Sequence, residues 1–223
     1  MANMELYFMT KSNMITIGIL STVAVLIVAI FIGTYNNVVN KEEQVTSAFA
    51  QIESNIQRKA DLIPGLIKTV KAYTKHEQEV FIKTTEARSG KTDINDLIKK
   101  LEESQAKTKE LAKGAKNKLN DEEYMGKLAL MQKKMGQNVT QLFAVAENYP
   151  QLRASDNFLS LQSQLEGTEN RINVARMSFN NTAKDYNATI RKLPGVIIAS
   201  MLGFQRKAYF EAKEEAKEVE VNF

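Results

Sequence analysis

The side chains that could perform chemistry are few, and their spacing favours none of the common catalytic sites. The chain has 223 residues with no cysteine and one histidine, His76, which lies in the charged run KAYTKHEQEV. A thiol nucleophile and a histidine-rich metal cluster are excluded, and no second histidine completes an H-E-x-x-H zinc site. The glycines form neither a P-loop nor a G-x-G-x-x-G loop. We therefore expect no catalytic residue, cofactor, metal or small-molecule substrate; a hydrolase using Glu169 or His76 is the alternative.

Two polar clusters could still support an interaction. One surrounds Arg58 and Asp61, and the other surrounds Glu169 and Arg176. Glu169 and Arg176 are seven residues apart, so on a helix they lie on nearly the same line. Arg58 and Asp61 occupy the matching place on an earlier segment. We expect an ion-pair layer between helices that fixes their register, and a patch that docks a partner is the alternative.

Composition indicates a mostly helical protein. The 10 glycines and 3 prolines are too few for a loop-rich or all-β fold. The 30 basic and 26 acidic residues give a net charge of +4 and are well mixed along the chain. This mixture is typical of solvated helix faces, whereas a nucleic-acid-binding protein concentrates its basic residues on one side. We expect no nucleic-acid partner.

An uncharged run near the N-terminus predicts a membrane anchor. No charged residue lies between Ser12 and Asn40, and Met14 to Ile32 reads MITIGILSTVAVLIVAIFI. As a helix these residues rise roughly 28 Å, close to the ~30 Å hydrocarbon core. A cleaved signal peptide is the competing interpretation, but it has a shorter apolar region and a small-x-small cleavage site. We predict an uncleaved transmembrane helix over residues 14–35, preceded by a flank over 1–13.

Bulky apolar residues recur every seven positions in the rest of the chain. This spacing marks the seam along which a helix packs against its neighbours. In the last long segment the seam residues are Phe158, Leu165, Ile172, Phe179, Tyr186 and Leu193.

The seams and the breaks between them predict the helix boundaries. We expect long helices over about 41–88, 92–149 and 155–193, a short helix over about 195–218, and a charged tail over 211–223. Pro64-Gly65 indicates a kink or short break in the first helix, not a reversal. In the second, residues 91–119 have a weak apolar face, so their order stays open. The predicted fold class is all-α: a transmembrane helix followed by an elongated, antiparallel three- to four-helix coiled-coil-like bundle over residues 36–210.

Several motifs occur in an order that is typical of a known protein family. The segment RKADLIPGLI from Arg58 is similar to the motif R-R-x-D-L-I-P-N-L-V, with Lys59 and Gly65 as departures. ENYPQLRA from Glu147 is similar to E-x-Y-P-x-L-K-A, and FLSLQSQLEGTENRINVAR from Phe158 is the most specific block. In these motifs the chain resembles the LemA family. The resemblance covers about residues 35–210 and implies a membrane-anchored antiparallel helical bundle in a bacterial inner membrane, without implying a reaction.

The candidate residues for structural or partner contacts come from the clusters, the motifs and the helix ends. They are Arg58, Asp61, Pro64, Arg88, Tyr149, Pro150, Glu169, Asn170, Arg171, Arg176, Tyr186 and Asn187.

These observations favour a membrane-anchored, non-enzymatic scaffold or adaptor. We expect it to contact membrane lipid and to bind other membrane proteins or further copies of itself through helix faces. The basic residues after the anchor favour a cytoplasmic C-terminal domain. The alternative is a lipid-facing module that organises or remodels the membrane through the apolar segment from Val196 to Phe204, in which case Ile198→Glu is expected to weaken lipid binding.

Overall fold

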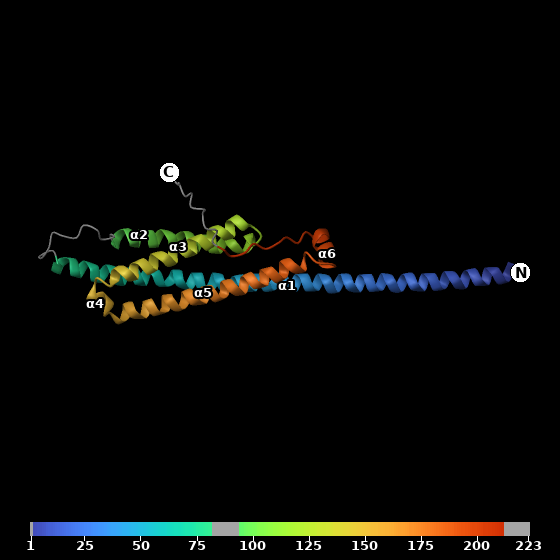
Figure 1. The fold of residues 1–223 in the computed structure, drawn as a ribbon, viewed down its shortest axis with the longest axis horizontal. Helices are drawn as coiled ribbons and strands as arrows, with labels where there is room; N and C mark the ends of the chain where they lie inside the picture. The colour runs from blue at the N-terminus through green and yellow to red at the C-terminus, as the bar shows by residue number, and fades with distance from the viewer. Residues whose placement is uncertain (1, 82–93, 212–223) are drawn as a thin grey trace, which may run out of the picture. The chain divides into compact units, whose positions relative to one another are not determined.

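The computed structural model describes residues 2–81 and 94–211, with side chains described over 13–73 and 94–211. These residues form helices and connecting segments, with no strand among them. The helices are α1 (Ala2–Phe81), α2 (Ile94–Ala115), the 3₁₀ turn η1 (Lys116–Lys118), α3 (Glu122–Ala146), α4 (Pro150–Arg153), α5 (Asp156–Thr189) and α6 (Gly195–Leu202) (Figure 1). The expected all-α class is confirmed.

The chain divides into two compact units. The first contains the chain up to Glu43 together with Asp185–Arg206, and the second contains Gln44–Lys184 together with the segment from Lys207. Helices α1 and α5 each contribute residues to both units.

The second unit is an antiparallel bundle built mainly from α1, α2, α3 and α5. Phe49 of α1 packs edge-on against Phe179 of α5 with ring centroids 5.8 Å apart. Ten residues further along α1, Lys59 pairs with Glu169, which lies ten residues earlier on α5. The two helices therefore run in opposite directions, as expected for an antiparallel bundle.

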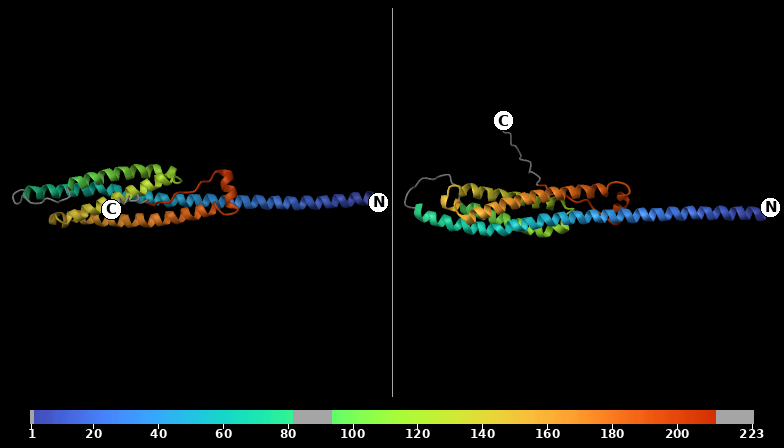
Figure 2. Two further views of the ribbon diagram at one scale, coloured as in Figure 1. Left: turned by 45° about the horizontal axis from the view of Figure 1, so that its top comes forward. Right: turned by 90° about the horizontal axis from the view of Figure 1, so that it is seen from below.

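Helices α2 and α3 form a hairpin within this unit and lie side by side in every view (Figures 1 and 2). The Tyr124 hydroxyl of α3 donates to the Leu111 carbonyl of α2 at 3.0 Å. Further along α3, the Asn138 amide donates to the Lys100 carbonyl, which lies earlier on α2, at 3.1 Å. The single helix expected over 92–149 is wrong, because η1 reverses the chain and the Asp121 carboxylate, 2.9 Å from the Tyr124 amide nitrogen, caps a new helix.

The residues of the predicted apolar seams form the core of this unit. Phe143 of α3 meets Phe158 of α5 edge-on, with ring centroids 5.7 Å apart. The α5 seam residues in this unit are buried, namely Phe158, Leu165, Ile172 and Phe179. The seam continues into the first unit, where Tyr186 is buried but Leu193, beyond the end of α5 at Thr189, is 77% exposed. One cluster of buried core residues contains Phe158 and Leu165 together with Ile63, Leu66, Val70, Leu97, Leu101, Met135 and Leu142.

The first unit joins the apolar part of α1 to the end of α5 and to α6. The Tyr186 hydroxyl donates to the Gln205 carbonyl at 3.0 Å, and the Tyr35 and Phe204 rings lie 6.3 Å apart. A side chain at Gly195 would place its Cβ 2.1 Å from the Thr189 carbonyl oxygen, so the turn between α5 and α6 requires glycine there.

The helix expected over 195–218 is too long, because α6 ends at Leu202. Gly203 follows with a φ of 76°, a left-handed conformation that glycine adopts at helix ends. The chain from Gly203 to Glu211 is not helical. In the second unit, which the chain re-enters at Lys207, the Ala208 amide donates to the Leu119 carbonyl at 2.7 Å, so the residues around Ala208 lie beside the α2–α3 turn.

Candidate functional site

The strongest candidate site is a polar layer inside the second unit. Lys59 of α1 is 1% exposed, and its ammonium lies 2.5 Å from the Glu169 carboxylate of α5. The Gln132 side chain of α3 donates to both carboxylate oxygens of Glu169, at 3.0 and 3.2 Å. Beside them, a Cβ added to Gly136 would lie 3.3 Å from the lysine nitrogen, so this glycine makes room for the ammonium.

The layer confirms that an ion pair exists between the helices, but it corrects one partner. Glu169 was predicted to take part, and it does. Arg58 was predicted on the other side, but it is exposed, and the neighbouring Lys59 turns inward instead. The cause is the helical period. Lys59 comes seven residues after Ile52 and three after Ile56, both of which are buried. It therefore lies on the same side of the helix, and the backbone directs its side chain into the core.

Asp61 lies outside the layer. It is exposed, its carboxylate accepts a hydrogen bond from the Gln57 amide at 2.6 Å, and Lys109 of α2 lies 3.4 Å away. The Gln57 hydrogen bond, followed by the contact with Lys109, lowers the pKa of the Asp61 carboxyl group. An exposed contact of this kind contributes little to stability, so Asp61 serves as a surface link between α1 and α2.

Pro64 explains a contact that the sequence did not indicate. Pro64 lies inside α1, where its missing N–H leaves the Ala60 carbonyl without its usual helical donor. The Gln105 side chain of α2 donates to this carbonyl. Ala60 is fully buried, so the carbonyl would otherwise lack a partner in the core. The expected interruption is therefore no break: α1 continues through Pro64, and α2 supplies the missing hydrogen bond.

Arg176 and the residues beside Glu169 occupy different environments. Arg176 is half-buried, with its guanidinium 5.7 Å from the centre of the Phe210 ring and its buried Nε without a hydrogen-bond partner in the structure as described. Phe210 is held in place because its amide donates to the Asn180 side chain at 2.8 Å. Asn170 and Arg171 are exposed on α5.

The remaining candidates lie at helix ends or outside the described chain. Tyr149 is half-buried and precedes Pro150, which is the first residue of α4. Tyr186 and Asn187 are buried in the first unit. Burial, followed by the negative charge of Glu42, raises the pKa of the Tyr186 phenol. Arg88 lies outside the described residues, as does the end of the first helix expected at 88.

A groove opens beside the polar layer, between α3 and α5. Its volume is about 800 Å³. Val139, Phe143, Phe158 and Leu159 contribute apolar walls, and the Lys59–Glu169 pair lies at one end. Over the described side chains, no group of three or more His, Cys, Asp or Glu residues could hold a metal ion. The groove therefore offers apolar contact and hydrogen bonding, without an evident set of reacting groups.

Comparison with known proteins identifies the family. The LemA family matches this chain over residues 48–223, which is most of its length. The chain belongs to the LemA family. The resemblance seen in the motifs is thus confirmed, and the polar layer and the Pro64 contact lie within the matched region.

Relatives with LemA-family sequences include magnetosome proteins. The chain is similar to the magnetosome protein MamQ of Magnetospirillum gryphiswaldense, with 28% identity over 207 residues that cover 90% of this chain and 72% of the relative. It is similar to MamQ 2 of Paramagnetospirillum magneticum, also with 28% identity, over 205 residues that cover 87% of this chain and 72% of that protein.

Proposed function

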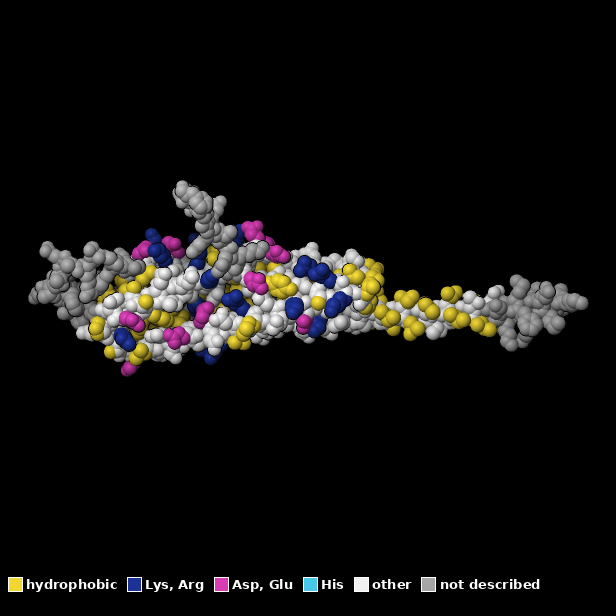
Figure 3. All heavy atoms as spheres, in the orientation of Figure 1, with side chains coloured by type: hydrophobic (Ala, Val, Ile, Leu, Met, Phe, Trp, Pro, Cys, Tyr) yellow, Lys and Arg dark blue, Asp and Glu magenta, His cyan; other side chains and the backbone are white. Residues whose placement is uncertain are grey.

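We propose that this LemA-family chain is a non-enzymatic scaffold, anchored in a membrane by α1, that holds other proteins or further copies of itself on its helix bundle. One helix, within Asn13–Tyr73, is long and apolar enough to cross a membrane, and its most apolar stretch is not buried. Figure 3 shows hydrophobic side chains along this exposed part of α1. A helix apolar on all sides needs an apolar surrounding, and lipid supplies it.

The groove between α3 and α5 carries the scaffold proposal. Apolar walls flanked by polar residues are typical of grooves that accept an amphipathic helix. Phe143 is half-buried and Leu159 is exposed, so both have apolar surface left for a partner. The rim includes Arg153 and Glu147, whose opposite charges suit a partner helix with charges of both signs. The occupant that we propose is an amphipathic helix, from another membrane protein or from a second copy.

Photo-crosslinking in the native membrane tests this proposal. A photoreactive amino acid at Leu159, on the groove wall, is expected to give a crosslinked product, identified by mass spectrometry as a second copy or a membrane protein. The matched control is Val174 on the same helix, which is also exposed but does not line the groove. A chain that stays monomeric, with no product at either position, would contradict the proposal.

The location that we propose is the bacterial cytoplasmic membrane, with the C-terminal bundle on the cytoplasmic side. The basic residues Lys41, Arg58 and Lys59 follow the apolar run, and Lys11 precedes it, so the positive-inside tendency favours this orientation. The relatives named as magnetosome proteins support a role at a membrane. Protease protection of the bundle in right-side-out vesicles, with digestion in inverted ones, is the expected result.

A second function is favoured by α6. Val196, Ile197, Met201 and Leu202 are exposed on this short helix. Apolar side chains of this kind suit contact with lipid, so a role in organising the membrane surface is the second candidate.

A further inference from the structure

We propose that α6 lies in the plane of the membrane surface, beside the end of the α1 anchor, as a shallow foot that inserts its exposed apolar face among the lipid headgroups and upper acyl chains. This inference rests on the proposed membrane anchoring by α1, and it adds a second membrane contact and its depth. All the residues that carry it belong to the first unit.

Most of the exposed apolar residues of α6 lie on one side of the helix. At 100° per residue, Val196, Ile197 and Met201 fall within less than half a turn of one another, and Leu202, at the end of the helix, is exposed as well. On the opposite side, Ile198 is buried. The helix is therefore held to the unit by one face and presents the other outward without apolar cover from the described chain.

The one polar residue on the outward face does not oppose insertion. Ser200 is exposed, but its hydroxyl is 2.9 Å from the Val196 carbonyl oxygen and 3.0 Å from that of Ile197, and it can donate to either. A hydroxyl that is already bonded to its own helix costs less to move out of water than a free one.

The contact between Phe204 and Tyr35 sets the depth of α6 in the membrane. At 1.5 Å per residue, Met14 to Gly33 spans about 30 Å, the thickness of the hydrocarbon core. Tyr35 then lies about 3 Å beyond the core, in the headgroup region where tyrosine is enriched. Phe204 follows α6 by two residues, and its ring is 6.3 Å from that of Tyr35. The end of α6 is therefore fixed at the level of the membrane surface.

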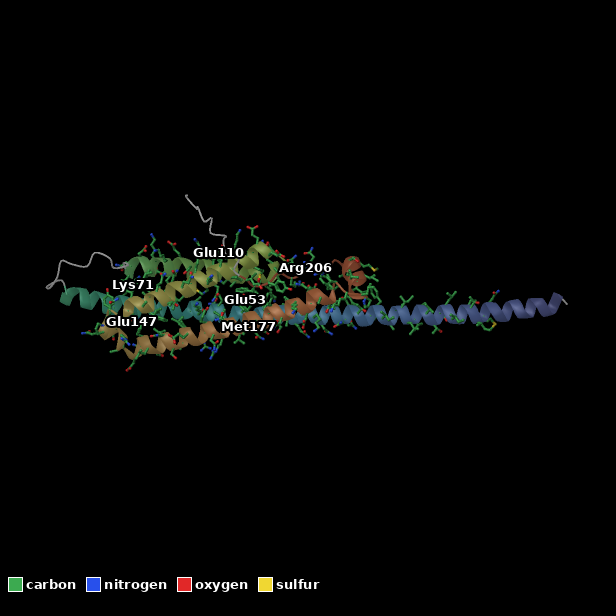
Figure 4. All side chains as sticks on the ribbon, viewed as in Figure 1. Glu53, Lys71, Glu110, Glu147, Met177 and Arg206 are labelled. Atoms are coloured by element: carbon green, nitrogen blue, oxygen red, sulfur yellow. The ribbon has the colours of Figure 1, made fainter. Side chains whose placement is uncertain are left out.

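Basic residues flank the apolar face. Arg191 and Lys192 precede α6, and both are exposed. Arg206, labelled in Figure 4, follows α6 and is exposed as well. Cationic groups beside an apolar helix face are the usual arrangement of helices that lie on a lipid surface, since the charges stay among the headgroups.

Fluorescent labelling of the full chain in lipid vesicles tests the proposal. Because the protein has no cysteine, a single introduced cysteine carries the only label. The test position is Met201→Cys, which is 67% exposed, and the matched control is Met177→Cys on α5, which is 61% exposed. Val23→Cys, in the middle of the apolar run, marks the deep membrane.

The expected result is selective quenching by lipids that carry a spin label. A label at Met201 should be quenched at least threefold more strongly than one at Met177, and best by spin labels near the headgroup. A label at Val23 should be quenched best by spin labels deep in the acyl chains. If the label at Val23 is quenched and the label at Met201 behaves like that at Met177, the placement of α6 at the membrane surface is refuted, whereas anchoring by α1 stands. If Val23 is not quenched either, the anchor itself is refuted.

A substitution on the outward face separates insertion from folding. Ile197→Glu is expected to remove the quenching at Met201, because a carboxylate opposes entry into lipid. Val174→Glu, on α5, should leave it unchanged. Ile198 is unsuitable for this test, since its side chain is buried and its replacement would disturb packing. Unchanged quenching in the Ile197→Glu variant would overturn the proposal.

Discussion

The hydrogen bond from Gln105 to the Ala60 carbonyl should depend on Pro64. Gln105→Met keeps the length of the side chain and removes its donor. The fully buried Ala60 carbonyl would then lose its partner, since proline has no N–H to offer. An unsatisfied buried acceptor costs about 1–3 kcal/mol, so the free energy of unfolding should fall by about 2 kcal/mol.

The double variant provides the decisive comparison. In Pro64→Ala, the new backbone N–H can donate to Ala60, so Gln105→Met should then cost less than about 0.5 kcal/mol. The difference between the two costs is a coupling energy of roughly 1–2 kcal/mol. Urea unfolding of the detergent-solubilised full chain, followed by far-UV circular dichroism, measures all four proteins. Equal costs of Gln105→Met with and without Pro64 would refute the reasoning.

Three further predictions concern burial and close contact. Glu169→Gln should lower the free energy of unfolding by about 3–5 kcal/mol, because it leaves the fully buried lysine without its counter-charge. Lys59→Met should lower it by less, because the carboxylate that it leaves unpaired is 37% exposed and can regain water. Urea unfolding that ranks the two variants oppositely would contradict this. Gly195→Ala should destabilise by more than about 2 kcal/mol through its clash with backbone, whereas Gly167→Ala, with open space on α5, should be neutral or stabilising by up to about 1 kcal/mol; thermal unfolding distinguishes them. Folding raises the pKa of Tyr186, so its neutral phenol contributes fully to the free energy of unfolding below about pH 10. This contribution should decline as the pH rises above that value. A Tyr186→Phe protein should show a weaker decline in urea midpoint over the same range.

The apolar stripes were predictable from sequence because heptad spacing reports directly on which residues face the core. The stripe of α1 also contained the signal for Lys59. Ile56 and Ile63 are seven residues apart, and Lys59 occupies the second seam position between them, three residues after Ile56. A charged residue at a core position of a regular stripe predicts a buried partner. The prediction of Arg58 rested on its place beside Asp61 and Pro64, which lies outside the apolar stripe.

The contacts between distant segments were beyond the reach of sequence patterns. Gln105 lies in a stretch of α2 with a weak apolar face, and nothing in its own spacing connects it to Pro64. The end of α6 depended on Gly203, which could have marked a helix end, but the apolar residues after it suggested continuation. Local patterns define faces and ends of helices, while the pairing of those faces requires the folded chain.

The Lys59–Glu169 pair is best understood as a device that fixes register. Seams that repeat every seven residues allow two helices to slip by one repeat and still match apolar residues. A slip of α5 by seven residues in one direction would bring Arg176 to the place of Glu169, opposite Lys59, and like charges would repel in the core. A slip in the other direction would bring Gln162 there and leave the lysine without a counter-charge.

Replacement of both Lys59 and Glu169 by leucine should therefore preserve or raise stability while permitting shifted pairing. Disulfide crosslinking detects this with cysteines introduced at Phe49 and Phe179, in register, and at Phe49 with either Ile172 or Tyr186, one repeat out of register in the two directions. If the double-leucine protein forms only the in-register disulfide, the pair has no role in register.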